Sequence, residues 1–428
     1  MAGGSNGHTP NMAQIRAFRL RAHHLDRIYS YEDIPEAAGA CGLQNTPPGA
    51  WENALYHRVP SCSPAQLEQL LYGCPQSPEN RGCPTASETG RTLLQAWSLR
   101  GAPFVFPASE SGIFLSALIP QAEEPWIYTR GIALALEYLG MEMEPLLELL
   151  KQVILRLDNV VITGKNVLDQ TLAEWMLPFL PEEKRSLWNR PSIYGEPDRQ
   201  TIGGAVVSFL LRPCALCGLV VFGRRMPEGP SFTSLRSWLG ASLSLEETAR
   251  QEAQKELVRK YLHCYGPAVP AMFADWLGCS KEQARRLWAA VSEEMEEVRV
   301  CGKTAWILAA DHDSLFSEPD FSRPVLLLNG YDPYLDQRDR TVLQPDKVLQ
   351  RKIWRTVSNP GAVIFQGRAV GIWTTRKKGN KMDAAVTLWP DREEKLPDET
   401  VLFREISGMV EEWGAFRGLT VREIRRTE

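Results

Sequence analysis

The sequence lacks a long uninterrupted apolar segment, and it lacks an N-terminal leader with an apolar centre. The longest apolar run, residues 206–222, is broken by Arg212 and Pro213 and is too short to cross a bilayer. The first residues are rich in Gly, Ser, Asn and Pro, which is not the pattern of a secretion signal. These absences predict a cytoplasmic protein without a membrane span, with a disordered leader over residues 1–12.

Cysteines are neither paired in number nor grouped as zinc ligands. There are 9 of them, an odd count, so free thiols are expected. Cys214 and Cys217 form one Cys-x-x-Cys, but no second such pair stands at ligand spacing, and zinc needs about four ligands. We interpret these two as small buried residues near a helix end. We therefore expect no metal and no cofactor.

A basic charge balance is also absent, because the formal net charge is −4. If the protein binds DNA, its Lys and Arg residues must gather on one face. The 428 residues predict two to four domains or one large body of several lobes. The 13 tryptophans predict several substantial cores, because large aromatic side chains anchor protein interiors.

Residues 244–308 carry the clearest structural pattern. Ser244 begins a segment with apolar residues at helical spacing, a short helix through Trp276 follows, and Ser280 caps a third helix. Two strand-like runs, 298–301 and 304–308, then form a hairpin. Three helices followed by a hairpin are typical of a winged helix, whose third helix enters a major groove. Here that helix carries cations but runs into a series of glutamates, which would repel phosphates, so a scaffold role is the alternative.

The C-terminal part is strand-rich and contains the most basic stretch of the chain. Residues 325–328, 362–365, 369–374 and 384–389 are predicted strands of an antiparallel sheet, joined by turns with hairpin chemistry. Cations on a hairpin suit phosphate contacts, whereas the alternative is a solvated loop tip. We favour DNA contact because the acidic residues lie elsewhere. The basic residues are Arg351, Lys352, Arg355, Arg368, Arg376, Lys377, Lys378 and Lys381.

Several short strings occur together in a fixed order. Examples are Ala17–Leu25, Gly42-Leu43-Gln44, Ala96–Gly101, Tyr331–Tyr334 and Gly367–Trp373. In this order and spacing the chain resembles, over nearly its whole length, the winged-helix DNA-binding family that contains the AlkZ-like DNA glycosylases.

The resemblance implies a mainly α fold with small antiparallel sheets, built from three tandem winged-helix units in a C-shaped body. The expected regions are 13–125 with the candidate catalytic loop, 126–240, 241–320, and a β-rich region 321–428. Family members hydrolyse the N-glycosidic bond of alkylated purines, and some unhook interstrand crosslinks. The expected partner is double-stranded DNA, and the expected state is a monomer. Arg100, in one of the matching strings, is a further expected DNA contact.

The family's catalytic motif is Gln, an apolar residue, then Gln or Asp, and it matches Gln44, Asn45 and Thr46 here. Gln44 could orient a water and Thr46 could hold it, but a hydroxyl cannot act as a general base near neutral pH. Asn45, Glu52 and His23 are possible catalytic support. A glutamate at a helix start is more often only solvated.

Three functions remain open from the sequence: a DNA glycosylase, a non-catalytic lesion binder, and a transcription regulator. Three winged-helix units in one chain favour the first. His23 and His24 point about 100° apart on a helix, so we expect one packed and one surface histidine. We expect Asp332 to cap the turn before Pro333, and Asp339 to be an ion-paired loop acid.

Overall fold

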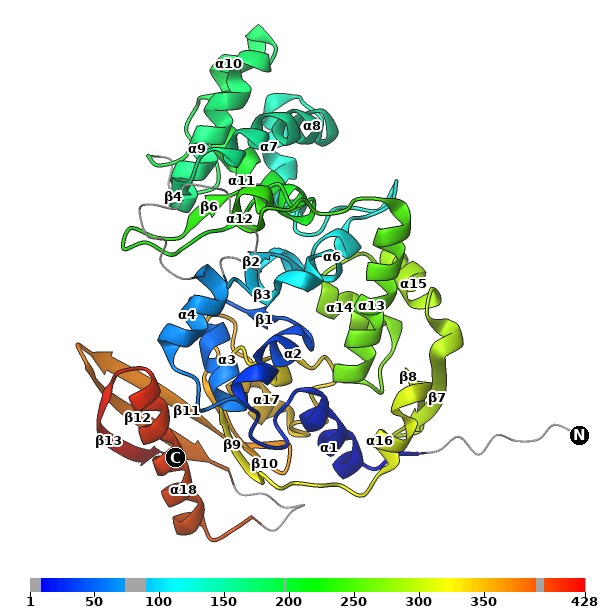
Figure 1. The fold of residues 1–428 in the computed structure, drawn as a ribbon, viewed down its shortest axis with the longest axis vertical. Coiled ribbons are helices and arrows are strands. Elements are labelled where there is room, and N and C mark those ends of the chain that lie inside the picture. Colours follow the sequence, from blue (N-terminus) through cyan, green and yellow to red (C-terminus); the bar gives the residue numbers. More distant parts are fainter. Residues whose placement is uncertain (1–8, 74–89, 196–197, 390–395, 428) are drawn as a thin grey trace, which may run out of the picture. The chain divides into compact units, whose positions relative to one another are not determined.

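The computed structural model describes residues 9–73, 90–195, 198–389 and 396–427 (Figure 1). The chain divides into two compact units. The first contains residues 1–67, 258–276 and 288–428, and the second contains residues 68–257 and 277–287. Most regular structure is helical, with small sheets, as predicted for the fold class. The predicted limits of the four regions remain predictions.

The N-terminal helix begins inside the predicted leader. Residues 1–8 of that leader lie outside the described residues, but its last part is wrong, because helix α1 spans Met12–Ala22. Asn11 Oδ1 accepts a hydrogen bond from the Gln14 backbone N–H at 2.9 Å, and Gln14 Oε1 accepts one from the Asn11 N–H at 2.9 Å. This reciprocal capping box satisfies two N–H groups at the helix start and therefore fixes it at Met12.

The first unit is organised around a five-stranded sheet of order β13-β12-β11-β10-β9. Side chains alternate between its faces. Val325 and Leu327 of β9 pack with residues of α18, whereas Leu326 and Leu328 pack on the opposite face with residues of α1. The sheet therefore has a helix-covered core on each side. The elements are β9 (Val325–Leu328), β10 (Gly361–Phe365), β11 (Arg368–Lys378), β12 (Lys381–Leu388), α18 (Glu399–Phe416) and β13 (Thr420–Thr427).

All four predicted strands of this sheet are present, but two further elements were not predicted. The four predicted strands pair antiparallel as expected, and the additional strand β13 pairs with β12 in parallel. Helix α18 covers one face of the sheet. The first unit also contains α2 (Ile34–Gly39), β1 (Leu43–Gln44), α3 (Ala50–Arg58), α16 (His312–Phe316) and α17 (Lys347–Ile353).

The three helices and the hairpin predicted between residues 244 and 308 are present. They are α13 (Glu247–Tyr265), α14 (Pro270–Leu277) and α15 (Lys281–Ala289), followed by antiparallel strands β7 (Met295–Val300) and β8 (Lys303–Leu308). Ser280 Oγ accepts a hydrogen bond from the Gln283 N–H at 3.1 Å, which is the predicted cap. The helices contain residues of both units, and their assignment as a winged helix remains a prediction.

The second unit is a helical body with two small sheets. Its core includes the buried apolar side chains of α11, which explains the longest apolar run of the sequence as a core helix. Cys214 lies buried near the end of α11, as predicted, whereas Cys217, which caps the helix, is only half-buried. None of the described helices is long and apolar enough to cross a membrane. The main elements are β2 (Leu93–Trp97), β3 (Pro103–Pro107), α7 (Ala133–Leu139), α8 (Met143–Val153), β4 (Ile162–Thr163), α9 (Lys165–Met176), α10 (Glu182–Trp188), α11 (Ile202–Leu216), β5 (Val221–Phe222), β6 (Ser231–Thr233) and α12 (Leu235–Leu239).

Candidate functional site

Gln44, the last residue of β1, lies beside Thr46, which belongs to the loop between β1 and α3. Gln44 is half-buried and Thr46 is exposed. The Gln44 Nε2 group donates a hydrogen bond to the backbone carbonyl of Thr46 at 3.2 Å, so the carboxamide is held beside that residue. A carboxamide and a hydroxyl therefore lie in one short, solvent-accessible loop of the first unit.

Asn45 has a different position from its two neighbours. Its side chain is buried, and its Oδ1 accepts a hydrogen bond from the Gly49 N–H at 2.7 Å. Gly49 has a φ of 89°, which favours glycine, and it precedes the first residue of α3. Asn45 therefore holds the loop closed at the start of α3 and does not face the solvent with Gln44 and Thr46.

Glu52, a candidate supporting carboxylate, is already paired. It lies in the first turn of α3, and its carboxylate forms an ion pair with the guanidinium of Arg417. Both side chains are partly buried. The structure thus places Glu52 in a contact between α3 and the end of α18.

A cavity of about 350 Å³ lies next to the Gln44–Thr46 loop, within the first unit. Pro47 and Pro48 of the loop form part of its lining. The lining includes three asparagines whose Oδ1 atoms are engaged by Trp413, His57 and the Arg355 backbone N–H, so these amides can offer their N–H donors to the cavity. The remaining lining residues are Ala50, Asn53, Asn329, Gly330, Tyr331, Arg355, Ser358, Asn359, Pro360, Gly361, Trp373, Thr374 and Thr375.

The wall formed by residues 329–331 is fixed from the end of α3. His57 Nε2 lies 2.8 Å from Asn329 Oδ1 and 3.3 Å from the Asn329 backbone nitrogen. Burial lowers the pKa of His57 to about 4, so its ring is neutral near neutral pH. Tyr331 has a φ of 78°, a left-handed conformation that is unusual for a residue with a side chain.

Arg58, which follows His57 at the end of α3, forms a buried ion pair. Arg58 donates to both carboxylate oxygens of Asp332, at 2.9 and 3.1 Å, and also to the His23 carbonyl at 2.8 Å. Asp332 Oδ1 accepts from the Tyr334 N–H at 3.0 Å, which confirms the predicted turn cap. Asp339 is ion-paired as predicted, with Arg19 at 2.7 Å. These partners lie hundreds of positions away, and the sequence did not indicate them.

Most of the predicted basic residues lie on the surface near this cavity. Arg376, Lys377, Lys378 and Lys381 are exposed at the tip of the β11–β12 hairpin, which continues outward from the lining residues of β11 (Figure 1). Arg351 and Lys352 are exposed in the last turn of α17, and Arg355 is exposed and lines the cavity.

Two predicted DNA-contacting arginines differ from this group. Arg368 is only 4% exposed, because the turn before it is covered: the Tyr334 hydroxyl donates to the Gly367 carbonyl at 2.9 Å. Arg100 belongs to the second unit and is half-buried, with a φ of 55° and its guanidinium 5.6 Å from the Phe104 ring centre.

The two adjacent histidines are both buried, so the expected surface histidine is wrong. His24 takes a φ of 57° after the end of α1, which turns its ring inward to Glu36 at 3.2 Å and to the ring of Tyr29. His23 Nδ1 lies 3.8 Å from Cys41 Sγ, and its ring packs edgewise on Tyr265. His23 therefore belongs to a separate buried cluster.

Comparisons with known proteins all match DNA glycosylases. The family described as DNA glycosylase AlkZ-like matches residues 84–416, a stretch that begins after the Gln44–Thr46 loop. The chain is 27% identical over 322 residues to an interstrand DNA cross-link repair glycosylase from Streptomyces sahachiroi, covering 72% of this chain and 76% of the relative. The structure is similar to that of the DNA glycosylase AlkZ from Streptomyces sahachiroi, with a TM-score of 0.67 and 23% identity, covering 97% of this chain and 100% of the other.

Proposed function

Because the chain belongs to the AlkZ-like DNA glycosylase family, it is a DNA-repair glycosylase, and we propose that it hydrolyses the N-glycosidic bond of alkylated purines in DNA at the Gln44–Thr46 loop. The family match does not include this loop. The proposal rests on the position of Gln44 and Thr46 directly before Pro47 and Pro48, which line a cavity together with Asn329 and Asn359. Since the named relative acts on interstrand crosslinks, we extend the proposal to crosslinked purines as a second substrate.

The reaction requires few functional groups from the protein. A purine alkylated at N7 or N3 carries positive charge and leaves readily, so the enzyme must place a water and stabilise an oxocarbenium-like sugar. In our proposal the Gln44 carboxamide orients that water and the Thr46 hydroxyl holds it. The departing base takes the bond electrons, and the water attacks the sugar carbon and releases its proton to solvent.

The other candidate residues take supporting roles. Asn45 positions the loop through its bond to the Gly49 N–H. Glu52 is engaged by Arg417 and receives no role in proton transfer. His23 packs against Cys41 and Tyr265 and likewise receives no catalytic role.

For DNA binding we propose the exposed cations of the hairpin and of α17, together with Arg355, which lines the cavity. Phosphate contacts from such residues fix the position of a duplex without reading its sequence. Arg368 is omitted because it is buried, and Arg100 stays a candidate on the second unit. Helix α15 fits a scaffold role better, because Arg286 is bound to Glu124 at 2.8 Å. Three tandem winged-helix units, a monomeric state and a cytoplasmic location remain part of the proposal.

A single-turnover excision assay on duplex DNA with one N7-methylguanine tests the proposal. The Gln44→Ala variant should lose most of the rate, and Thr46→Ala should be slowed less. Gln69→Ala, an exposed glutamine on α4 (Pro64–Tyr72), is the matched control and should keep the wild-type rate.

Two results would contradict the placement of the site. Full activity of Gln44→Ala would remove the loop from the mechanism. Salt-sensitive duplex binding without any product, on both the methylated and a crosslinked duplex, would favour lesion binding over hydrolysis.

A further inference from the structure

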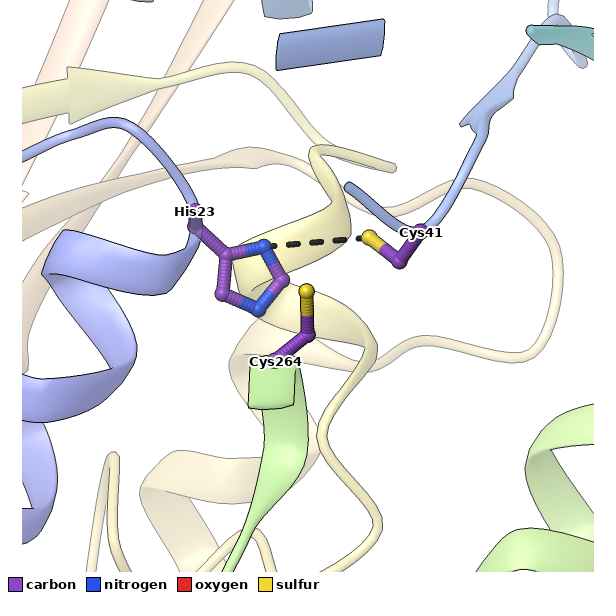
Figure 2. Close-up of side chains that lie close together, drawn as sticks. All are labelled: His23, Cys41 and Cys264. Atoms are coloured by element: carbon purple, nitrogen blue, oxygen red, sulfur yellow. Dashed lines mark hydrogen bonds between the residues drawn. The ribbon is translucent and has the colours of Figure 1, made fainter. Parts of the chain in front are cut away.

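A buried cluster contains three side chains of the kinds that bind metal ions, and one of them, Cys41, lies three residues before Gln44. His23, Cys41 and Cys264 come from three separate segments of the first unit, and their ligand atoms lie within 4.8 Å of one another (Figure 2). His23 follows the last residue of α1, Cys41 lies between α2 and β1, and Cys264 is in the last turn of α13. We propose that these three side chains bind one Zn²⁺ ion, which joins the start of the Gln44 loop to α1 and α13.

The geometry suits a zinc site. With Zn–S bonds of about 2.3 Å and Zn–N bonds of about 2.0 Å, tetrahedral coordination separates N and S ligands by about 3.5 Å and two sulfurs by about 3.8 Å. His23 Nδ1 and Cys41 Sγ are 3.8 Å apart. Both sulfurs in Figure 2 lie along the same side of the His23 ring. Shifts of about 1 Å would bring all three into coordination distance.

The charges also suit a divalent soft ion. The three side chains are 0–3% exposed, so an ion bound there would be almost completely removed from water. Two thiolates neutralise Zn²⁺, which avoids burying a net charge. Zinc binds thiolate and imidazole ligands well, whereas calcium and magnesium prefer oxygen ligands.

The histidine gives independent support. Among the described residues, His23 Nε2 has no hydrogen-bond partner although it is buried. A buried polar atom without a partner is costly and calls for an explanation such as an absent ion. Coordination through Nε2, after a rotation of the ring, would give this atom a partner; coordination through Nδ1, the nitrogen that faces Cys41, would leave Nε2 without one.

Oxygen atoms are available for a fourth position. The Ala40 carbonyl lies 3.3 Å from Cys264 Sγ, the Ala22 carbonyl lies 3.8 Å from it, and the Tyr265 hydroxyl lies 3.6 Å from Cys41 Sγ. A water held by one of these oxygens would complete four-coordination. Sequence spacing did not indicate this site, because its ligands are not grouped in the chain and the only Cys-x-x-Cys lies elsewhere.

The test uses the full chain, purified under reducing conditions without a metal-affinity step. Elemental analysis should find about one zinc per chain in the wild type and almost none in Cys41→Ser and Cys264→Ser. Cys301→Ser, which removes an exposed cysteine, is the control and should keep its zinc. Replacement by Co²⁺ should produce thiolate-to-cobalt charge-transfer bands and the visible bands of tetrahedral cobalt.

A second measurement on the wild type covers the case that the serine variants do not fold. After chelation, two additional thiols should react with a thiol reagent, and added Zn²⁺ should protect both again. No bound zinc after reconstitution, unchanged zinc in both serine variants, or preferential binding of Cu⁺ would each overturn the proposal. These readouts do not depend on DNA or on glycosylase activity.

Discussion

Arg58 and Asp332, separated by 274 positions in the sequence, form a bidentate ion pair in the interior of the first unit. Arg58 ends α3, the helix that follows the Gln44–Thr46 loop, and Asp332 follows Tyr331 in the cavity wall. Their side chains are 1% and 0% exposed. The ion pair therefore fixes the loop-bearing helix to the opposite wall of the cavity.

Replacing the acid of this pair should strongly destabilise the protein. The variant Asp332→Asn leaves the Arg58 charge buried without its partner, so the free energy of unfolding should fall by about 3–5 kcal/mol. Urea denaturation measures this loss. The control is Asp336→Asn, whose partner Arg338 is partly exposed and whose loss should be about 0–1 kcal/mol. Similar small losses in both variants would mean that the buried pair is not intact in solution.

His57 should make the stability depend on pH on the acidic side of neutrality. Burial lowers the pKa of its folded form from 6.5 to about 4. As the pH falls through about 6.5, His57 becomes protonated in the unfolded chain but stays neutral in the folded chain. The free energy of unfolding therefore decreases until about pH 4. The loss from this group should be roughly 3 kcal/mol.

Urea denaturation at several pH values between 7 and 4 measures this loss. The His57→Gln variant should show a flatter profile across that window, and His312→Gln, a half-buried histidine beside Glu296, should keep more of the wild-type slope. An unchanged slope in His57→Gln would contradict the assignment.

The strands of the first unit could be predicted because their signals are local. Gly367 and Gly379 have φ values of 77° and 63°, and each forms a turn between alternating or apolar runs. Helix α18 also carries local signals, since Asp398 Oδ1 accepts from the Thr400 N–H and buried apolar residues such as Leu402 and Ile406 follow at helical spacing. The same kind of local signal therefore predicts this helix.

The cavity and the buried contacts could not be predicted in the same way. Asn53 and Asn329 line one cavity, but nothing in their neighbouring residues indicates that α3 meets the end of β9. Arg368 belongs to a basic stretch, yet the covering of the preceding turn by Tyr334 buries it. Such contacts depend on the packing of distant segments, whereas the proposal of Gln44 depends on its motif.

Gly49 should tolerate a side chain poorly. Gly49→Ala places a Cβ in a left-handed conformation and within 3.2 Å of Arg417 Nη2, so it should cost more than the backbone strain of about 1–2 kcal/mol. Gly418→Ala has a φ of 64° with open space around the new Cβ, so it reports the backbone strain alone. Thermal unfolding compares the two, and excision kinetics should be slowed only in Gly49→Ala. Equal losses would show that the Arg417 contact is not restrictive.

Thr46→Asp should accelerate excision of N7-methylguanine. A carboxylate orients a nucleophilic water more strongly than a hydroxyl does, and it restores an acid that the family motif allows at this position. We expect the single-turnover rate at saturating protein to rise at least about tenfold. The isosteric variant Thr46→Val, which removes the hydroxyl, should instead lower the rate. If both variants match the wild type, position 46 does not contact the attacking water.

The hairpin cations should contribute to DNA affinity rather than to chemistry. Replacing Lys377, Lys378 and Lys381 by Ala removes up to three phosphate contacts from an exposed strand tip. The slope of log K against log salt concentration should then become shallower by about 0.9 for each lost contact. Fluorescence anisotropy with an unmodified duplex at several salt concentrations measures this slope, and the single-turnover rate at saturating protein should change little.

Arg404→Ala, which removes an exposed cation on α18, is the control and should keep the wild-type slope. An unaltered slope in the triple variant would move the phosphate contacts away from the hairpin, whereas a slope unaltered together with a lost rate would assign the hairpin to the lesion itself.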